Sequence, residues 1–180
     1  MMQRKGALNM DDQQALSLVA LQKSQAMMEL RDCNHLTGQY GLSLSDAQIT
    51  SLVTQRFETL QNTGRIEFGT GVLKKLIEAF CDSVYITQEN YEETLSTLQE
   101  LFYYYKNESL DTLSDDELIE FMHSNFEGPC QGALDYLSDT SLEGLCRNAR
   151  YALNGISAAD EDEDEDEGAN DDADGWNEDY

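Results

Sequence analysis

Basic residues are scarce in this chain. Its 180 residues include 11 Lys and Arg against 36 Asp and Glu, which gives a formal net charge of −25. Thirteen of the acids lie at 160–180, and this leaves 23 acids against 11 bases upstream. Nucleic-acid binding depends on Lys and Arg that neutralise phosphates. The balance therefore argues against direct binding to DNA, RNA or an anionic membrane surface.

Metal-ligand motifs and long apolar runs are also lacking. The two histidines, His35 and His123, are far apart and no C-x-x-C pair occurs, so the spacing of a zinc site is absent. The cysteines, which we expect to be reduced and mostly in the core, are Cys33, Cys81, Cys130 and Cys146. No apolar run approaches the ~20 residues of a membrane span, and residues 1–12 lack a secretory-signal pattern. We expect a cytoplasmic protein without a metal or other cofactor.

No segment has the pattern of a catalytic or nucleotide-binding site. Residues 64–69 have the glycine spacing of a phosphate loop, but the Lys and Ser or Thr that must follow are missing. A calcium loop that began at Asp111 would need a glycine where Asp116 stands and a glutamate where Met122 stands. No serine or cysteine belongs to a recognisable motif with a histidine. These absences favour a protein that is not an enzyme.

Apolar residues recur at helical spacing along most of the chain, which contains a single proline. Two capping boxes, Ser45 with Gln48 and Ser114 with Glu117, mark helix starts. The expected helices span 12–33, 45–63, 71–80, 87–105, 114–127, 130–137 and 141–153. We predict an all-α fold, an irregular bundle of six or seven helices, as one domain over 1–156 in which 1–11 is frayed.

The segment between the second and third expected helices is rich in glycine. Residues 65–68 alternate polar and apolar side chains but are too short to form a sheet, so we expect an extended connector. Free N–H groups at the start of the third helix, with basic side chains nearby, could hold a small anion. The residues of this candidate anion or ligand site are Arg65, Gly71, Lys74 and Lys75. The alternative is that the glycines only end one helix and begin the next.

Three consecutive tyrosines lie near the end of the expected fourth helix. At about 100° per residue, Tyr105 falls on an apolar seam and is expected at the edge of the core. The other seam residues are Tyr91, Leu95, Leu98 and Phe102. Tyr103 and Tyr104 point away from the seam, so they either pack under a neighbouring helix or form an exposed patch that binds a protein partner.

The composition changes sharply after Ser157. Residues 160–167 are all Asp or Glu, and 160–180 contains no base. Like charges at this density repel one another and offer little to bury. We predict a disordered acidic tail over 157–180, which either improves solubility or binds a basic protein.

Three segments of the chain carry a resemblance to a known family. They are IEAFCDS at 77–83, KNESLD at 106–111 and LSDDELIEFM at 113–122. Together with their surroundings, over roughly residues 30–147, they resemble a bacterial family of small proteins known only as a domain of unknown function. The resemblance implies a cytoplasmic all-helical protein. It implies no activity, cofactor or site residue.

These observations lead to one preferred function and two alternatives. The absence of catalytic motifs, the surplus of aromatic residues and the acidic tail favour a module that binds another protein. An enzyme or small-ligand protein would need a pocket near the connector, with Glu67, Cys81 and the tyrosines beside the candidate anion residues. In the second alternative, the tail itself binds a basic protein.

Overall fold

A computed structural model describes residues 10–153, and every regular element in this range is helical. The elements in order are α1 (Met10–Thr37), η1 (Gly38–Tyr40), α2 (Asp46–Thr63), α3 (Val72–Phe80), α4 (Tyr91–Glu108), α5 (Asp115–Glu127), α6 (Leu134–Tyr136), η2 (Leu137–Leu142) and α7 (Glu143–Leu153). The acidic tail predicted at 157–180, the domain end expected at 156 and most of the segment expected to fray lie outside the described residues.

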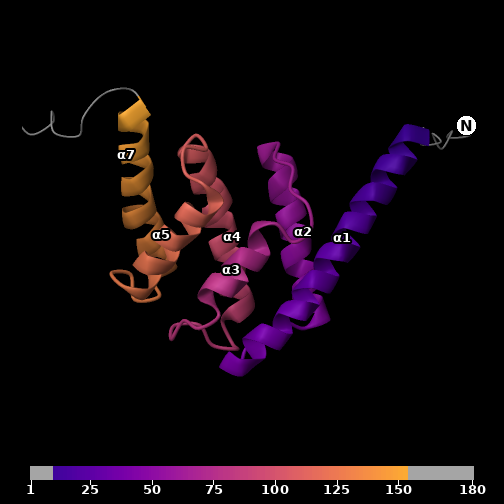
Figure 1. The fold of residues 1–180 in the computed structure, drawn as a ribbon, viewed down its shortest axis with the longest axis horizontal. Helices are drawn as coiled ribbons and strands as arrows, with labels where there is room; N and C mark the ends of the chain where they lie inside the picture. Colours follow the sequence, from indigo (N-terminus) through magenta and orange to yellow (C-terminus); the bar gives the residue numbers. More distant parts are fainter. Residues whose placement is uncertain (1–9, 154–180) are drawn as a thin grey trace, which may run out of the picture.

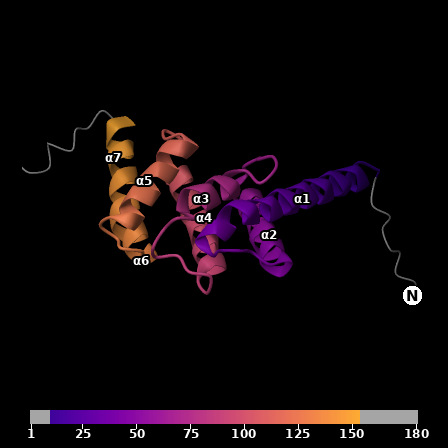
Figure 2. The ribbon, with the colours of Figure 1, turned by 60° about the horizontal axis from the view of Figure 1, so that its bottom comes forward.

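The helices form one irregular bundle, which confirms the predicted all-α class. α1 packs against α2 and α3, α2 packs against α4, and α3 packs against both α4 and α5. α1 lies along one side of the bundle, and its N-terminal half extends past the other helices in both ribbon views (Figures 1 and 2). Among residues 10–153, no helix combines the length and the apolar character that crossing a bilayer requires.

Both predicted capping boxes are present. Ser45 Oγ accepts the N–H of Gln48 at 3.4 Å, and Gln48 Oε1 accepts the N–H of Ser45 at 2.9 Å. The pair of Ser114 and Glu117 repeats this arrangement at the start of α5, and hydrogen bonds from Ser114 hold the pKa of the Glu117 carboxyl below its ordinary value. Each box satisfies N–H groups that a helix start leaves without partners. Two helix starts were therefore predictable from local sequence.

The apolar faces predicted for α3 and α4 form the centre of the core. The buried residues of α3 are Val72, Leu73, Leu76, Ile77 and Phe80. The whole seam predicted in α4 is buried as well, from Tyr91 to Tyr105. Because α4 contacts α2, α3, α5 and α7, it is the central helix, and a wide arc of its surface is covered.

Two helices differ in length from the prediction. α1 runs to Thr37, beyond the expected end at Cys33, and the Thr37 hydroxyl donates to the backbone oxygen of Leu42 at 2.9 Å. α4 begins at Tyr91, not at Thr87, because the side chain of Asn90 accepts the N–H of Thr87 at 2.8 Å. That side-chain bond closes a turn that competes with the helix.

The last two predicted helices are one continuous helical run, from Leu134 to Leu153, so the start expected at residue 130 is wrong. The break expected at 138–140 is instead the π-helical segment η2. Its first and last residues, Leu137 and Leu142, are buried, and the backbone oxygen of Ser138 accepts the hydroxyl of Tyr105 at 2.9 Å. The polar residues at 138–140 suggested a loop, but packing against α4 and α5 keeps them helical.

Candidate functional site

The connector between α2 and α3 turns its apolar side chains outward. Ile66 is 83 % exposed and Phe68 is 75 % exposed. Glu67, which lies between them, points its carboxylate into the protein, and its side chain is only 21 % exposed. Alternating segments normally bury their apolar residues. Here the charged residue is held inside, and two large apolar side chains face solvent.

A completely buried arginine holds Glu67 in this position. Arg56 Nη2 donates to Glu67 Oε2 at 3.0 Å, and Arg56 Nη1 donates to the backbone oxygen of Gly69 at 2.9 Å. The hydroxyl of Tyr103 donates to the same Glu67 oxygen at 2.7 Å, and the N–H of Val72 does so at 3.4 Å. One carboxylate oxygen thus joins α2, α3 and α4. We call Arg56, Glu67 and Tyr103 the buried polar network.

Gly71 is required by this network. Its backbone has φ 51° and ψ −134°, a combination that residues other than glycine rarely adopt. A Cβ atom there would lie 2.1 Å from Glu67 Oε2 and 2.4 Å from Arg56 Nη2. The glycine predicted as part of an anion site therefore serves to admit the chain's own carboxylate to the start of α3.

The predicted anion-site residues do not converge on one point. Glu67 occupies the start of α3, because Val72 donates its N–H to that carboxylate. The basic residues bind other acids of the chain: Arg65 pairs with Asp111 at 2.7 Å, Lys75 with Asp116 at 2.7 Å, and Lys74 with Glu78 at 3.7 Å. An external anion would have to displace an internal carboxylate, and the prediction of an anion site has no support in this geometry.

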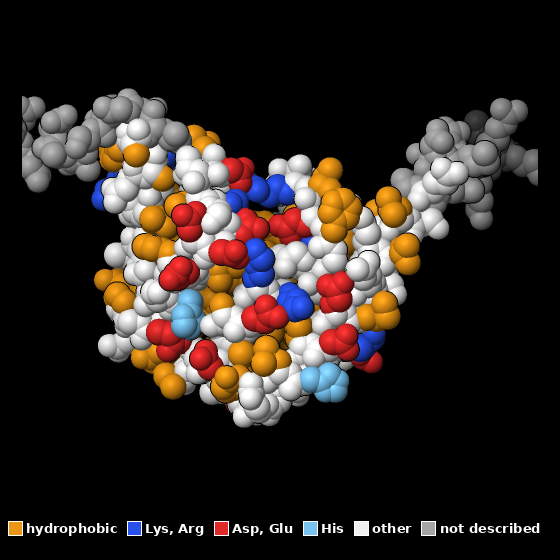
Figure 3. Space-filling model, viewed as in Figure 1, with side chains coloured by type: hydrophobic (Ala, Val, Ile, Leu, Met, Phe, Trp, Pro, Cys, Tyr) orange, Lys and Arg blue, Asp and Glu red, His pale blue; other side chains and the backbone are white. Residues whose placement is uncertain are grey.

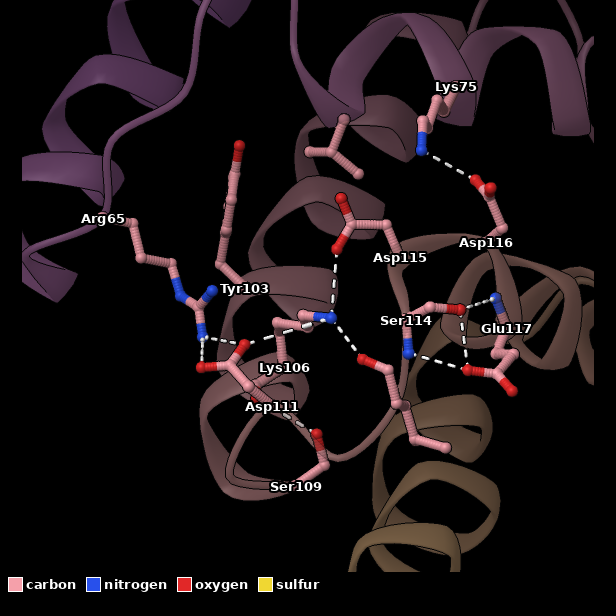
Figure 4. A network of polar contacts seen from close by, with 12 residues as sticks. Arg65, Lys75, Tyr103, Lys106, Ser109, Asp111, Ser114, Asp115, Asp116 and Glu117 are labelled. Atoms are coloured by element: carbon pink, nitrogen blue, oxygen red, sulfur yellow. Dashed lines mark hydrogen bonds and ion pairs between the residues drawn. The ribbon is translucent and has the colours of Figure 1, made fainter.

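Lys106 organises the turn between α4 and α5 (Figure 4). Its buried ammonium group donates to the backbone oxygen of Leu113 and pairs with Asp115 at 3.1 Å. Asp111 lies in the same turn and accepts Arg65 Nη2 at 2.7 Å and 2.9 Å through its two carboxylate oxygens. The pair of Arg65 and Asp111 therefore links the connector to this turn. The acids that resembled a calcium loop form ion pairs at the end of α4 and the start of α5.

The three tyrosines have different environments. Tyr105 is buried at the core edge, as predicted. Tyr103 is 1 % exposed, so the surface role considered for it is wrong: α4 is covered on several sides, and the Tyr103 hydroxyl reaches Glu67. Tyr104 is 56 % exposed, with its ring edge-on to that of Tyr105 at a centroid distance of 4.9 Å. A tyrosine patch is therefore reduced to a single exposed ring.

A small groove lies beside the connector, between α1 and α2. Its volume is about 160 Å³, and its apolar walls are Val19, Phe57, Leu60 and Ile66. Glu67 also lines it. Apolar side chains gather beside α1 in the upper right of the face drawn in Figure 3. Sites for small molecules usually measure about 300–1,000 Å³, so this groove fits a single large side chain.

A larger cleft separates α3 from α5. It measures about 440 Å³ and has Ala79 and Ile119 among its lining residues. Lys75 and Asp116 line it from opposite helices and pair with each other at 2.7 Å. Glu78, Glu120 and His123 line it as well, and His123 Nε2 is buried without a hydrogen-bond partner. The predicted pocket residues are also divided, because Lys75 lies here while Glu67 lies at the groove.

The cysteines are free and buried, as expected for core thiols. Burial raises the pKa of Cys33, Cys81 and Cys146, and a protonated thiol is a poor nucleophile. Within the described residues, no group of three or more His, Cys, Asp or Glu side chains is placed to hold a metal ion.

Alkaline pH is expected to destabilise the protein. Burial raises the pKa of Tyr91 and Tyr103, in the same direction as the three thiols. The folded state therefore keeps protons that the unfolded state releases above about pH 8.5 for cysteine and about pH 10 for tyrosine. Because the folded state then binds more protons than the unfolded state, the free energy of unfolding falls as pH rises.

Urea unfolding followed by circular dichroism under reducing conditions measures this effect. We expect a constant midpoint near neutral pH and a progressive fall up to about pH 10.5, with at most about 1.4 kcal/mol per pH unit for each titrating group. Equal free energies of unfolding at pH 7.5 and at pH 10, as approximate test points, would contradict the prediction.

Sequence patterns did not single out Arg56, although they contain a signal for it. It follows Val53 by three residues and precedes Leu60 by four, and both are buried. A basic residue at these steps lies on the apolar face of its helix, where a charge requires a buried partner. That partner could not be identified, because Glu67 and Tyr103 are distant in sequence.

Comparison with known proteins adds one result. A model of a family of unknown function matches residues 29–155. No curated protein and no solved structure matches the chain. The matched range includes the buried polar network and the connector, whereas residues 10–28 of α1 precede it.

Proposed function

We propose that this chain, which belongs to DUF6323, a family of unknown function, is a cytoplasmic, non-catalytic protein–protein interaction module. Its partner is a protein that presents an amphipathic helix with apolar residues on one face and basic residues beside them. The helix docks along the groove between α1 and α2 and contacts Ile66 and Phe68.

The outward position of Ile66 and Phe68 carries the proposal. Exposed apolar residues are common singly, but these two flank a charged residue that three hydrogen-bond donors hold inside. A fixed backbone that presents two large side chains reduces the entropy lost on binding. The connector therefore has the properties of a preorganised contact surface.

The size of the groove supports a protein partner over a small ligand. Interfaces owe most of their affinity to a few large side chains that fill pockets. A volume of about 160 Å³ with walls from Val19, Phe57 and Leu60 accommodates one such side chain. It is below the usual range for small-molecule sites. A leucine, methionine or aromatic residue of the partner is the expected anchor.

Charge supports a basic partner. The described residues contain 23 acids and 9 bases, and Glu67 lines the groove with its side chain 21 % exposed. None of the described residues donates to Glu67 Oε1, whereas Oε2 accepts three bonds. A lysine or arginine next to the anchor can reach this oxygen, and complementary charge also speeds association.

Binding of a defined peptide tests this function. The probe is a labelled synthetic amphipathic helix with leucines on one face and lysines on the other, titrated by fluorescence anisotropy. The test variant is Ile66→Ser with Phe68→Ser. The matched control is Val84→Ser, which removes an apolar group that is 80 % exposed elsewhere on the surface. We expect the test variant to bind at least about tenfold more weakly, and the control to bind like the original chain.

The other outcomes count against the proposal. Equal binding by the original chain and the Ile66→Ser, Phe68→Ser variant would remove the connector from the interface. Loss of binding only in a chain that ends at Ala159 would assign the partner to the acidic tail. Preference for the same peptide with glutamate in place of lysine would contradict the charge argument.

A further inference from the structure

The solvent face of α1 carries side chains at the spacing of a helix–helix seam. Leu18, Leu21, Gln25 and Met28 follow one another at steps of three, four and three residues, the a and d positions of a heptad. All four are exposed, with Leu18 at 57 %, Leu21 at 65 % and Met28 at 55 %. We call these four residues the α1 seam.

The α1 seam is distinct from the face of α1 that packs on the bundle. Ala26, Leu30 and Cys33 are the buried residues of that face. At about 100° per residue, their mean direction lies about 130° from that of the seam. The groove takes Val19 from the buried side of the helix. The seam is therefore a second apolar surface, and it is independent of the proposed binding groove.

Charge is almost absent from this part of the chain. Residues 13–28 contain one charged residue, Lys23, and its ammonium lies over the Phe57 ring, 5.2 Å from the ring centroid and away from the seam. Ser17, Gln22 and Ser24 flank the seam and are uncharged. In the chain as a whole, 26 % of residues are charged. Interface centres are depleted in charge in the same way.

This depletion indicates which partner fits the seam. Two copies of a chain with a net charge of −25 repel each other wherever their acidic faces meet. The α1 seam is a surface on which they can meet without placing acid against acid. A basic partner would gain little from it, because the nearest carboxylate, Glu29, already accepts hydrogen bonds from Gln25 and Thr70.

We infer that α1 pairs with α1 of a second copy of this chain, and that the two helices run antiparallel. Asp32 occupies the next seam position after Met28, so a parallel pair would place Asp32 against Asp32. An antiparallel pair places Asp32 opposite the exposed Gln14 and Leu18 opposite Met28. It also puts the two acidic bundles at opposite ends of the pair.

The strength of this dimer follows from its size and charge. The four seam residues span only about three helical turns, or about 15 Å. Such a contact is smaller than a standard stable interface, so the dimer dissociates in the micromolar range or above. Repulsion between the bundles opposes it, and salt screens that repulsion. Association therefore strengthens as salt increases, which is opposite to the expectation for a basic partner in the groove.

Analytical ultracentrifugation of the full chain tests the inference. Concentrations run from low micromolar to several hundred micromolar, in about 0.05 M and about 0.5 M NaCl. We expect the mass to rise from 20.3 kDa towards twice that value, and at lower concentration in the higher salt. A monomer at every concentration in both salts would overturn the inference.

Variants of exposed residues test the seam and its direction. Leu18→Glu with Leu21→Glu is expected to stay monomeric, whereas the control Ile66→Glu dimerises. Leu18→Lys and Met28→Glu chains are each expected to dimerise weakly and to pair with each other when mixed, because these positions face each other only in the antiparallel arrangement. A dimer that persists in the Leu18→Glu, Leu21→Glu variant would show that the α1 seam is not the interface. If the mixed Leu18→Lys and Met28→Glu chains do not associate, the antiparallel arrangement is wrong.

Discussion

Replacement of Arg56 by methionine is expected to lower the free energy of unfolding by about 3 kcal/mol, the lower end of the range for breaking a buried ion pair. The methionine fills much of the space but leaves the Glu67 carboxylate without its cationic partner and Gly69 without a donor. The lower end applies because the Glu67 side chain is 21 % exposed, so water can solvate part of its charge.

Removal of the unpaired charge from the Arg56→Met variant separates the effect of charge from that of packing. Glu67→Gln in the Arg56→Met background keeps an acceptor for Tyr103 and removes the unpaired charge, so at least about 1 kcal/mol should return. Arg56→Lys is expected to restore little, because one ammonium cannot reproduce the planar fork that holds Glu67 and Gly69 together. Urea denaturation followed by circular dichroism gives all these values. A loss below about 1 kcal/mol for Arg56→Met would contradict a structural role for the pair.

Replacement of Gly71 by alanine is expected to have an effect of similar size, at least about 3 kcal/mol. Backbone strain at a positive φ contributes about 1–3 kcal/mol. The added Cβ would also lie 2.1 Å from Glu67 Oε2 and 2.4 Å from Arg56 Nη2, so the ion pair must move. We also expect weaker peptide binding, because Ile66 and Phe68 lose their fixed position.

Gly64 provides a matched control for that experiment. It also has a positive φ, 67°, but nothing lies within 4 Å of the position of its Cβ. Gly64→Ala should therefore show only the strain of a left-handed residue, about 1–2 kcal/mol. The difference between the two variants in urea unfolding measures the contact with the buried polar network. Equal losses of unfolding free energy for Gly64→Ala and Gly71→Ala would mean that the buried polar network accommodates the added Cβ with no further loss of stability.

Local sequence was sufficient for those parts of the fold that depend on neighbouring residues. Ser45 and Ser114 meet their partners three residues later, and the face of α3 repeats within nine residues. Helix limits set by tertiary contacts were less predictable. The polar residues at 138–140 stay helical because η2 packs against α5 and accepts a hydrogen bond from Tyr105, and neither contact has a local signature.

The connector could be predicted from the sequence, but the contacts that fix its conformation could not. The glycines and the alternation of residues 65–68 identified the connector as the irregular element. They could not indicate that Glu67 would point inward, since its partners Arg56 and Tyr103 belong to other helices. For the same reason the sequence left two alternatives for Tyr103, and its burial selects packing under neighbouring helices: a single helix cannot show how many neighbours cover it.

The continuity of α1 has a consequence for valency. Its 28 residues form a rod of about 42 Å at about 1.5 Å per residue. The rod carries one wall of the groove and the α1 seam without an intervening hinge. In the inferred pair, two grooves would therefore be held at a fixed separation. A partner with two basic helices at the matching distance would bind the second one intramolecularly, and avidity would then make up for a weak single contact.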